Sequence, residues 1–151
     1  MTTLAAIRDA VEDQLRDGLE PQGFNVCRAL TPNIPLPAIV VHAPLFSEGL
    51  DYHGTMGPTG AWGSGDWVIA VAIDTALSDE LMTSALDIAE PTSDRSIFKV
   101  MNADTTLGGV LGTGGFVVLS ARSTGIETTP GHPPYWGVEF ACKVAARKTE
   151  P

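Results

Sequence analysis

Residues 66–74, with the sequence DWVIAVAID, constrain the fold of this chain more than any other stretch. In a β-strand, successive side chains point to opposite faces, so a residue and its second neighbour share a face. Here both faces are apolar, with Trp67, Ile69, Val71 and Ile73 on one and Val68, Ala70 and Ala72 on the other. A strand that is apolar on both faces is buried on both, so this segment is predicted to be central in a sheet.

Four further segments read as strands. Residues 24–30 and 38–42 are short and apolar, and Pro44 ends the second of them. Residues 116–124 and 135–145 form a closing hairpin, joined by a predicted loop at 127–134 that holds three prolines. Strict alternation in the last strand predicts a core-facing set consisting of Trp136, Val138, Phe140, Cys142 and Val144.

Helical periodicity appears in three places. Near the N-terminus, Leu4, Ile7, Val11 and Leu15 form an apolar stripe, and Gly18 is predicted to end that helix. The acidic residues on its other face are expected to be solvated; they are Asp9, Glu12, Asp13 and Asp17. A second helix is predicted over residues 79–89, with Ser78 as its cap.

Residues 90–109 are predicted to join two parts of the sheet through a third, short helix. Pro91 ends the preceding helix, and Ser93 or Asp94 is the expected cap of the next one. Ile97, Val100 and Met101 then share one face, and Leu107 is expected to enter the core. Gly108 and Gly109 are predicted to form a turn.

The element order predicts one α+β domain over residues 1–151, which is an ordinary length for a single domain. Its sheet is expected to be mostly antiparallel, with two to three helices packed on one face. Residues 43–65 contain six glycines and little apolar periodicity. Such long irregular stretches are usually functional or disordered, so a long protruding β-hairpin or loop is predicted there.

No catalytic signature emerges from the sequence. His42, His53 and His132 lack metal-binding spacing, and the glycine-rich residues 108–115 lack the Lys-Ser/Thr of a phosphate-binding loop. Cys27 and Cys142 are expected to be reduced, with a disulfide as the alternative. We therefore predict no catalytic residue, no cofactor and no metal, and that the protein is not an enzyme.

Charge is distributed unevenly along the chain. Residues 1–94 hold 3 basic and 14 acidic groups, whereas residues 95–151 hold 6 basic and 4 acidic groups. The basic residues are too few and too scattered to attract nucleic acid by neutralising phosphates. The acidic surplus is explained by solubility or by a surface along which DNA passes without binding. No apolar run approaches the roughly 20 residues that cross a bilayer, so no membrane contact is expected.

One combination of motifs resembles a known family. Pro91, the run SDRS at 93–96, an apolar triplet and the run DTTLGG at 104–109 precede the alternating strand at 135–145. This order resembles the tail terminator proteins of long-tailed phages of actinobacteria.

The resemblance implies an α+β structural protein of the virion tail, assembled in the host cytoplasm. It implies a homo-oligomeric ring, expected to be a hexamer, that ends the tail tube and joins it to the head-neck connector. The implied partners are the tail tube protein, the head-neck connector protein and DNA that passes through the lumen.

The candidate ring-interface or lumen residues are Glu48, Asp51, Tyr52, His53, Asp66, Arg122, Arg147 and Lys148. Among them, Glu48, Asp51 and Asp66 are expected to contribute to an acidic inner wall. The basic C-terminal segment is expected to face the acidic residues of a neighbouring subunit, because a closed ring needs two different contact patches on each subunit. Two alternatives stay open. One is another head-tail joint protein, such as a neck or head completion protein. The other is a small-ligand-binding or enzymatic α+β domain with a pocket beneath residues 43–65 that contains Trp62 and His53.

Overall fold

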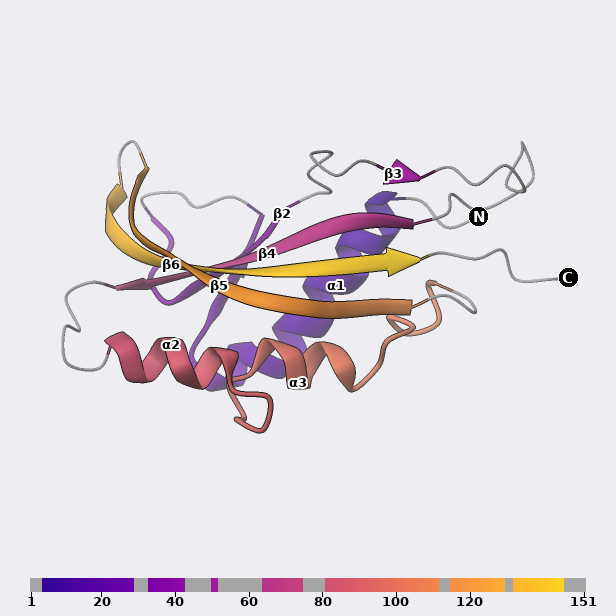
Figure 1. Ribbon diagram of the computed structural model, residues 1–151, viewed down its shortest axis with the longest axis horizontal. Coiled ribbons are helices and arrows are strands. Elements are labelled where there is room, and N and C mark those ends of the chain that lie inside the picture. Colours follow the sequence, from indigo (N-terminus) through magenta and orange to yellow (C-terminus); the bar gives the residue numbers. More distant parts are fainter. Residues whose placement is uncertain are drawn as a thin grey trace, which may run out of the picture.

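The computed structural model describes residues 4–28, 33–42, 50–51, 64–74, 81–111, 115–129 and 132–145. They form a mixed sheet with three α-helices against one face (Figure 1). The strand order is β1-β2-β4-β6-β5, and β3 pairs with β4 beside the end of β2. The strands are β1 Asn25–Cys27, β2 Ala38–His42, β3 Leu50–Asp51, β4 Ser64–Asp74, β5 Gly115–Thr129 and β6 His132–Ala145. All pairs are antiparallel except β1 with β2, so the predicted α+β class with a mostly antiparallel sheet is confirmed.

β4 is the central strand, as its sequence predicts. It pairs with β2 on one side and with β6 over its full length on the other. Its odd-numbered residues Trp67, Ile69 and Val71 are buried in the core beneath the helices. The ring of Trp67 meets that of Phe116 edge-on, with a centroid separation of 6.4 Å. The other face is less covered, because Val68 and Ala70 are half-buried and only Ala72 is buried, so the expected burial on both faces is confirmed only in part.

The hairpin of β5 and β6 is longer than the sequence predicts. The expected loop at 127–134 is wrong, because Glu127 pairs with Tyr135 and Thr129 pairs with His132. The pairing of β4 with β6 stops at Asp74 and Tyr135. Beyond that point β6 pairs with β5 alone in the described chain. Proline has no backbone N–H to donate to a neighbouring strand, and Pro133 and Pro134 lie where β6 has no second neighbour in the described chain that would accept such a hydrogen bond.

Helix α1 spans Leu4–Leu19 and presents Ile7, Val11 and Leu15 to the core. The prediction that Gly18 ends this helix is wrong, because the helix continues through it. A Cβ atom built on Gly18 would lie 2.7 Å from Cγ1 of Val100, so the glycine allows α3 to approach closely. The short 3-10 helix Glu20–Gln22 follows, and Gly23 ends it with a left-handed φ of 93°.

Helices α2 Leu81–Ala89 and α3 Ile97–Asn102 lie nearly end to end on the same face of the sheet (Figure 1). The cap of α3 is Ser96, whose hydroxyl accepts a hydrogen bond from the Lys99 amide at 3.1 Å. The prediction of Ser93 or Asp94 as cap is therefore wrong. Ile97, Met101 and Leu107 are buried, as predicted.

The two cysteines are free thiols, as expected. Cys27 lies on β1 and Cys142 on β6, and β2 and β4 separate these strands. The disulfide alternative is thereby excluded within one subunit, because neighbouring strands are about 4.8 Å apart and a disulfide needs Cα atoms within about 7 Å.

The predicted protruding hairpin at 43–65 lies largely outside the described residues. The structure shows only its base, where Leu50 pairs with Gly65 and Asp51 with Ser64. The length and conformation of the hairpin therefore stay a prediction.

Candidate functional site

Most of the residues singled out from the sequence lie outside the described part of the chain. These are Glu48, Tyr52, His53, Arg147 and Lys148. Of the remaining three, Asp51 and Asp66 lie on neighbouring strands at one end of the sheet. Arg122 lies on β5, where both Nε and Nη2 donate to Oε2 of Glu139, at 3.2 and 2.9 Å. The structure therefore brings Asp51 near Asp66, whereas Arg122 forms an ion pair on a different part of the sheet.

Side chains that could hold a metal do not gather among the described residues. Within these ranges, no group of three histidine, cysteine or acidic side chains lies close enough to hold a metal. Burial raises the pKa of the Cys142 thiol to about 12, so it carries no thiolate at neutral pH. Among the described helices, none combines the length and the apolar composition needed to cross a membrane.

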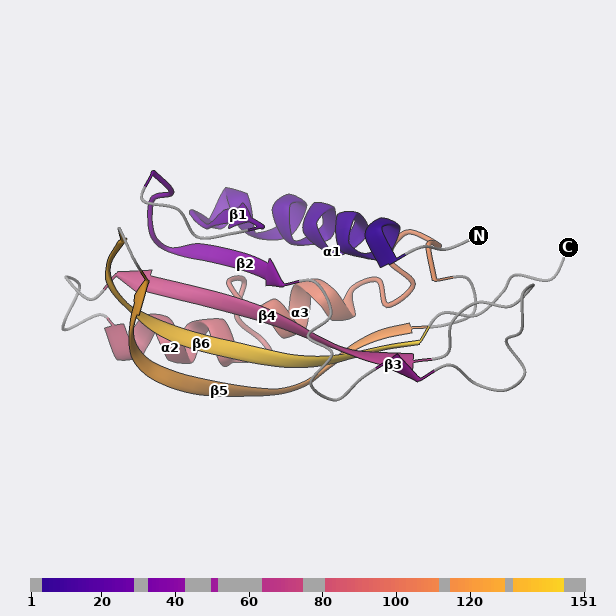
Figure 2. The same cartoon turned by 90° about the horizontal axis from the view of Figure 1, so that it is seen from above.

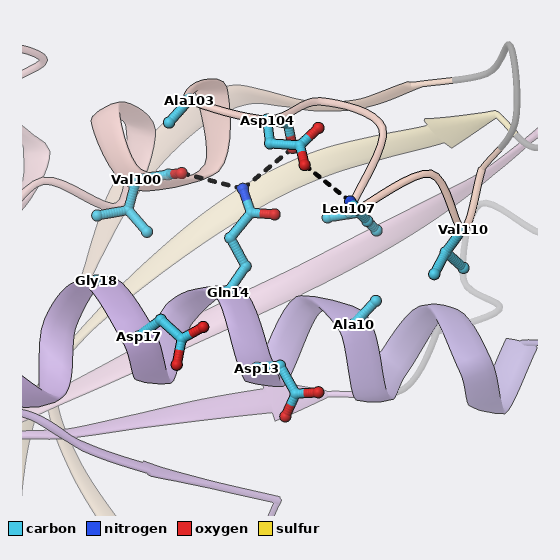
Figure 3. A pocket seen from close by; sticks show the side chains of 11 residues that line it. Ala10, Asp13, Gln14, Asp17, Gly18, Val100, Ala103, Asp104, Leu107 and Val110 are labelled. Atoms are coloured by element: carbon cyan, nitrogen blue, oxygen red, sulfur yellow. Dashed lines mark hydrogen bonds between the residues drawn. The ribbon is translucent and has the colours of Figure 1, made fainter.

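A hollow lies between α1 and the segment that contains α3 and the following turns (Figure 3). We call it the α1–α3 groove; its volume is about 630 Å³. Its apolar walls come from both elements and comprise Ala10, Val100, Leu107 and Val110. Its ionisable lining residues are all acidic: Asp13, Asp17 and Asp104.

Gln14 fixes the width of the groove. Its amide nitrogen donates to the carbonyl oxygens of Val100, Met101 and Asp104, at distances of 3.0, 3.2 and 3.1 Å (Figure 3). The carbonyls of Val100 and Met101 lie in the last turn of α3, where helix geometry leaves them without intrahelical partners, and that of Asp104 lies just beyond the helix. One side chain of α1 therefore caps α3 and holds the two walls at a defined separation.

Asp104 shapes the turn at the far wall. Its carboxylate accepts hydrogen bonds from the amide and hydroxyl of Thr106, at 3.0 and 2.7 Å, and from the amide of Gly108 at 2.8 Å. The hydrogen bonds from Thr106 and Gly108 hold the pKa of Asp104 below its usual value. Leu107, Gly108 and Gly109 all have positive φ in this turn, which a plain flexible linker would not require.

A second surface is the free edge of the sheet. In the described chain β5 pairs with β6 alone, and it is 15 residues long. Several large apolar side chains along it are exposed, including Val117 at 45%, Leu119 at 61% and Ile126 at 66%. Leu86 of α2 is 66% exposed, and it lines a small hollow of about 180 Å³ together with Ala121 and Trp136. We call Leu119, Ile126 and Leu86 the β5 edge surface.

The opposite edge of the sheet is held by ion pairs instead. Glu12 of α1 is only 8% exposed, and its two oxygens accept hydrogen bonds from Arg16 and Arg28, each at 2.7 Å. Arg28, which follows β1, also contacts Asp9 at 2.7 Å. Burial would raise the pKa of Glu12, but the hydrogen bonds from Arg28 and Arg16 outweigh it and lower the pKa. The prediction that Glu12 is solvated is therefore wrong.

Sequence reasoning missed both the α1–α3 groove and the β5 edge surface. A glutamine within a polar helix face carries no mark that distinguishes Gln14 from a solvated residue. Gly18 offered a weak signal, because an interior helix glycine usually has a packing reason. The exposed apolar residues of β5 read as part of an ordinary strand, since the sequence does not reveal which strand lies at the edge.

Comparison of the chain with models of known protein families gave no match, and a search among curated proteins also gave none.

Proposed function

We propose that this protein is a structural subunit that assembles with copies of itself into a ring and resembles phage tail terminators in this role. The observation that carries the proposal is the β5 edge surface. Monomeric proteins seldom leave a long strand unpaired at a sheet edge while exposing large apolar side chains along it. A neighbouring subunit would bury Leu119, Ile126 and Leu86 and would cover the unpaired edge.

The proposed role is a joint at the end of a phage tail tube, with a hexamer as the expected ring. The tail tube protein and the head-neck connector protein would be its partners, and DNA would pass through its lumen in the virion. The support for this finer role is the sequence resemblance together with a fold of the implied α+β class. Asp51 and Asp66, at one end of the sheet, are the described candidates for an acidic wall, with Glu48 beside them in the sequence.

Assembly is tested first with the unaltered protein. Light scattering coupled to size-exclusion chromatography should give a mass several times the subunit mass of 15.9 kDa, and negative-stain micrographs should show closed rings. A protein that stays monomeric at all accessible concentrations would contradict the proposal.

The interface is tested by replacing both Leu119 and Ile126 with aspartate. Because both side chains are exposed in the subunit, the variant should fold with a nearly unchanged melting temperature but should fail to assemble. Phe98→Asp is the matched control, because Phe98 is a partly exposed apolar residue of α3 outside the β5 edge surface. Rings that form equally well in both variants would remove β5 from the interface.

The tail-joint role itself is tested by complementation. Purified protein added to tail tubes that lack their terminator should stop their elongation and allow them to join filled heads. If rings form but do not bind tubes, the proposed self-assembly stands and the tail-joint role is overturned.

A further inference from the structure

The α1–α3 groove has the features of a docking surface for a peptide segment. Its volume of about 630 Å³ is in the range that holds a small ligand or a few side chains. Its apolar walls, Ala10, Val100, Leu107 and Val110, are supplied by two separate elements that Gln14 holds together. An occupant therefore needs aliphatic surface to cover these walls.

The charged residues at the rim of the groove favour a positively charged occupant. Asp13, Asp17 and Asp104 line it, and no lysine or arginine does. Oδ1 of Asp13 lies 3.7 Å from Nη1 of Arg16, which makes a weak ion pair. In the described part of the chain, no ion pair to a cation is found for Asp17 or Asp104. A lysine or arginine side chain combines the aliphatic stem and the charge that this groove would bind.

The chain holds nine such residues, and seven of them lie in the described ranges. Five of the seven form ion pairs: Arg8, Arg16, Arg28, Lys99 and Arg122. Arg95 lies over the ring of Phe24 at 4.7 Å, and Lys143 also has an interaction partner. The remaining two, Arg147 and Lys148, are adjacent in the segment that follows β6.

We propose that the segment containing Arg147 and Lys148 of one subunit docks into the α1–α3 groove of the next subunit. The two cations would lie against Asp13 and Asp17, and their aliphatic stems would cover Ala10 and Val110. This inference rests on the proposed ring. It supplies the second contact patch of each subunit, distinct from the β5 edge surface, that a closed ring with head-to-tail contacts requires.

The end of β6 lies close to the turn that forms one wall of the groove. β6 ends at Ala145 beside Gly115, and the amide of Phe116 donates to the carbonyl of Thr105 at 2.8 Å. In Figure 3 the strands pass behind α1 and the turn that contains Asp104. Because a closed ring needs a contact between subunits, the proposal assigns the segment to the neighbouring copy, and the single-chain disulfide described below distinguishes the two cases.

Disulfide trapping between two differently labelled copies tests the proposal. One copy carries Asp17→Cys and the other Lys148→Cys, both in a Cys27→Ser background that leaves only the buried Cys142. Under mild oxidation the mixture should give a covalent dimer whose linked peptides contain positions 17 and 148. Asp94→Cys replaces Asp17→Cys in the matched control, because Asp94 is an exposed acid of the same layer outside the groove, and this pair should not crosslink.

Charge reversal gives an independent readout. Asp17→Lys should raise the concentration needed for half-assembly about tenfold, because it places like charges together. Adding Arg147→Glu and Lys148→Glu to the same chain should restore assembly to within about threefold, whereas Asp94→Lys alone should leave it unchanged.

The outcomes separate this inference from the ring itself. If the unaltered protein assembles but gives neither the crosslink nor the rescue, the docking is wrong and the ring stands. A 17–148 disulfide that forms within one chain carrying both cysteines, at dilutions where the protein is monomeric, also overturns it. A protein that never assembles overturns both proposals.

Discussion

At one edge of the sheet, β1 is three residues long and is closed by α1; at the other, β5 is 15 residues long and exposes large apolar side chains. Figure 2 shows α1 beside β1 and β2, with β5 at the far side of the sheet. The first edge ends in the contacts among Glu12, Arg16 and Arg28 within the subunit. The second has no comparable cover in the described chain. Within the described chain, the sheet is therefore covered at one edge and open at the other.

The largest effect on the closed edge should come from Glu12→Ala. The change leaves Arg16 and Arg28 without their shared carboxylate and should lower the free energy of unfolding by about 2 kcal/mol, less than for a fully buried pair because both arginines are partly exposed. Urea denaturation measures the loss. Asp13→Ala is the control. Asp13 is exposed and its carboxylate lies as far as 3.7 Å from Arg16, so the loss of this weak ion pair should change the free energy of unfolding little. Equal losses in both variants would show that Glu12 has no special role.

Lowering the pH should weaken the contacts of Glu12 at the same edge without any mutation. The pKa of Glu12 is lowered in the folded protein, so its contribution is fully present above its unfolded pKa, near 4.5. That contribution is lost as the pH falls through the folded pKa, which lies lower. Thermal melts between pH 7 and pH 3 should therefore show a steeper loss of stability in the unaltered protein than in Glu12→Ala. Parallel curves would contradict this assignment.

A smaller effect is expected where α1 packs on α3. Gly18→Ala would place Cβ 2.7 Å from Val100, and the clash should outweigh the gain in helix propensity, for a net loss of about 1 kcal/mol. The double variant with Val100→Ala should recover most of that loss relative to Val100→Ala alone, as a double-mutant cycle would show. A stabilising Gly18→Ala would mean that α3 moves away freely and that the width of the groove is not fixed.

The smallest effect should come from the open edge. Arg122→Ala removes the ion pair with Glu139, but Arg122 is largely exposed, so stability should fall by less than about 0.5 kcal/mol. If the same variant weakens assembly, Arg122 contacts a neighbouring subunit, as expected from the sequence. A loss well above 1 kcal/mol in the isolated subunit would contradict the view that this edge is not stabilised internally.

Patterns that depend on a residue's immediate neighbours could be read from the sequence. The alternation of β6 and the face of β4 that carries Trp67 each predicted a buried face, and Trp67, Phe140 and Cys142 are buried accordingly. Features decided by distant partners could not be predicted. Glu12 is buried because Arg28 lies 16 positions further along the chain and reaches it. Likewise, Ser93, Asp94 and Ser96 are all plausible caps, and only the packing of Ile97 selects Ser96.

The three register shifts in the pairing of β5 with β6 have a consequence for how the free edge meets other chains. They fall after Val118, Ser123 and Glu127, along the same strand that exposes apolar side chains. The first two shifts each leave one residue of β5 out of the ladder, and the third leaves out one residue of β5 and two of β6. Each shift increases the local twist, so the outer edge presents no long straight run of amide and carbonyl groups. Open-ended strand addition, as in amyloid, needs such a flat run. The irregular edge therefore resists the open-ended growth of fibres.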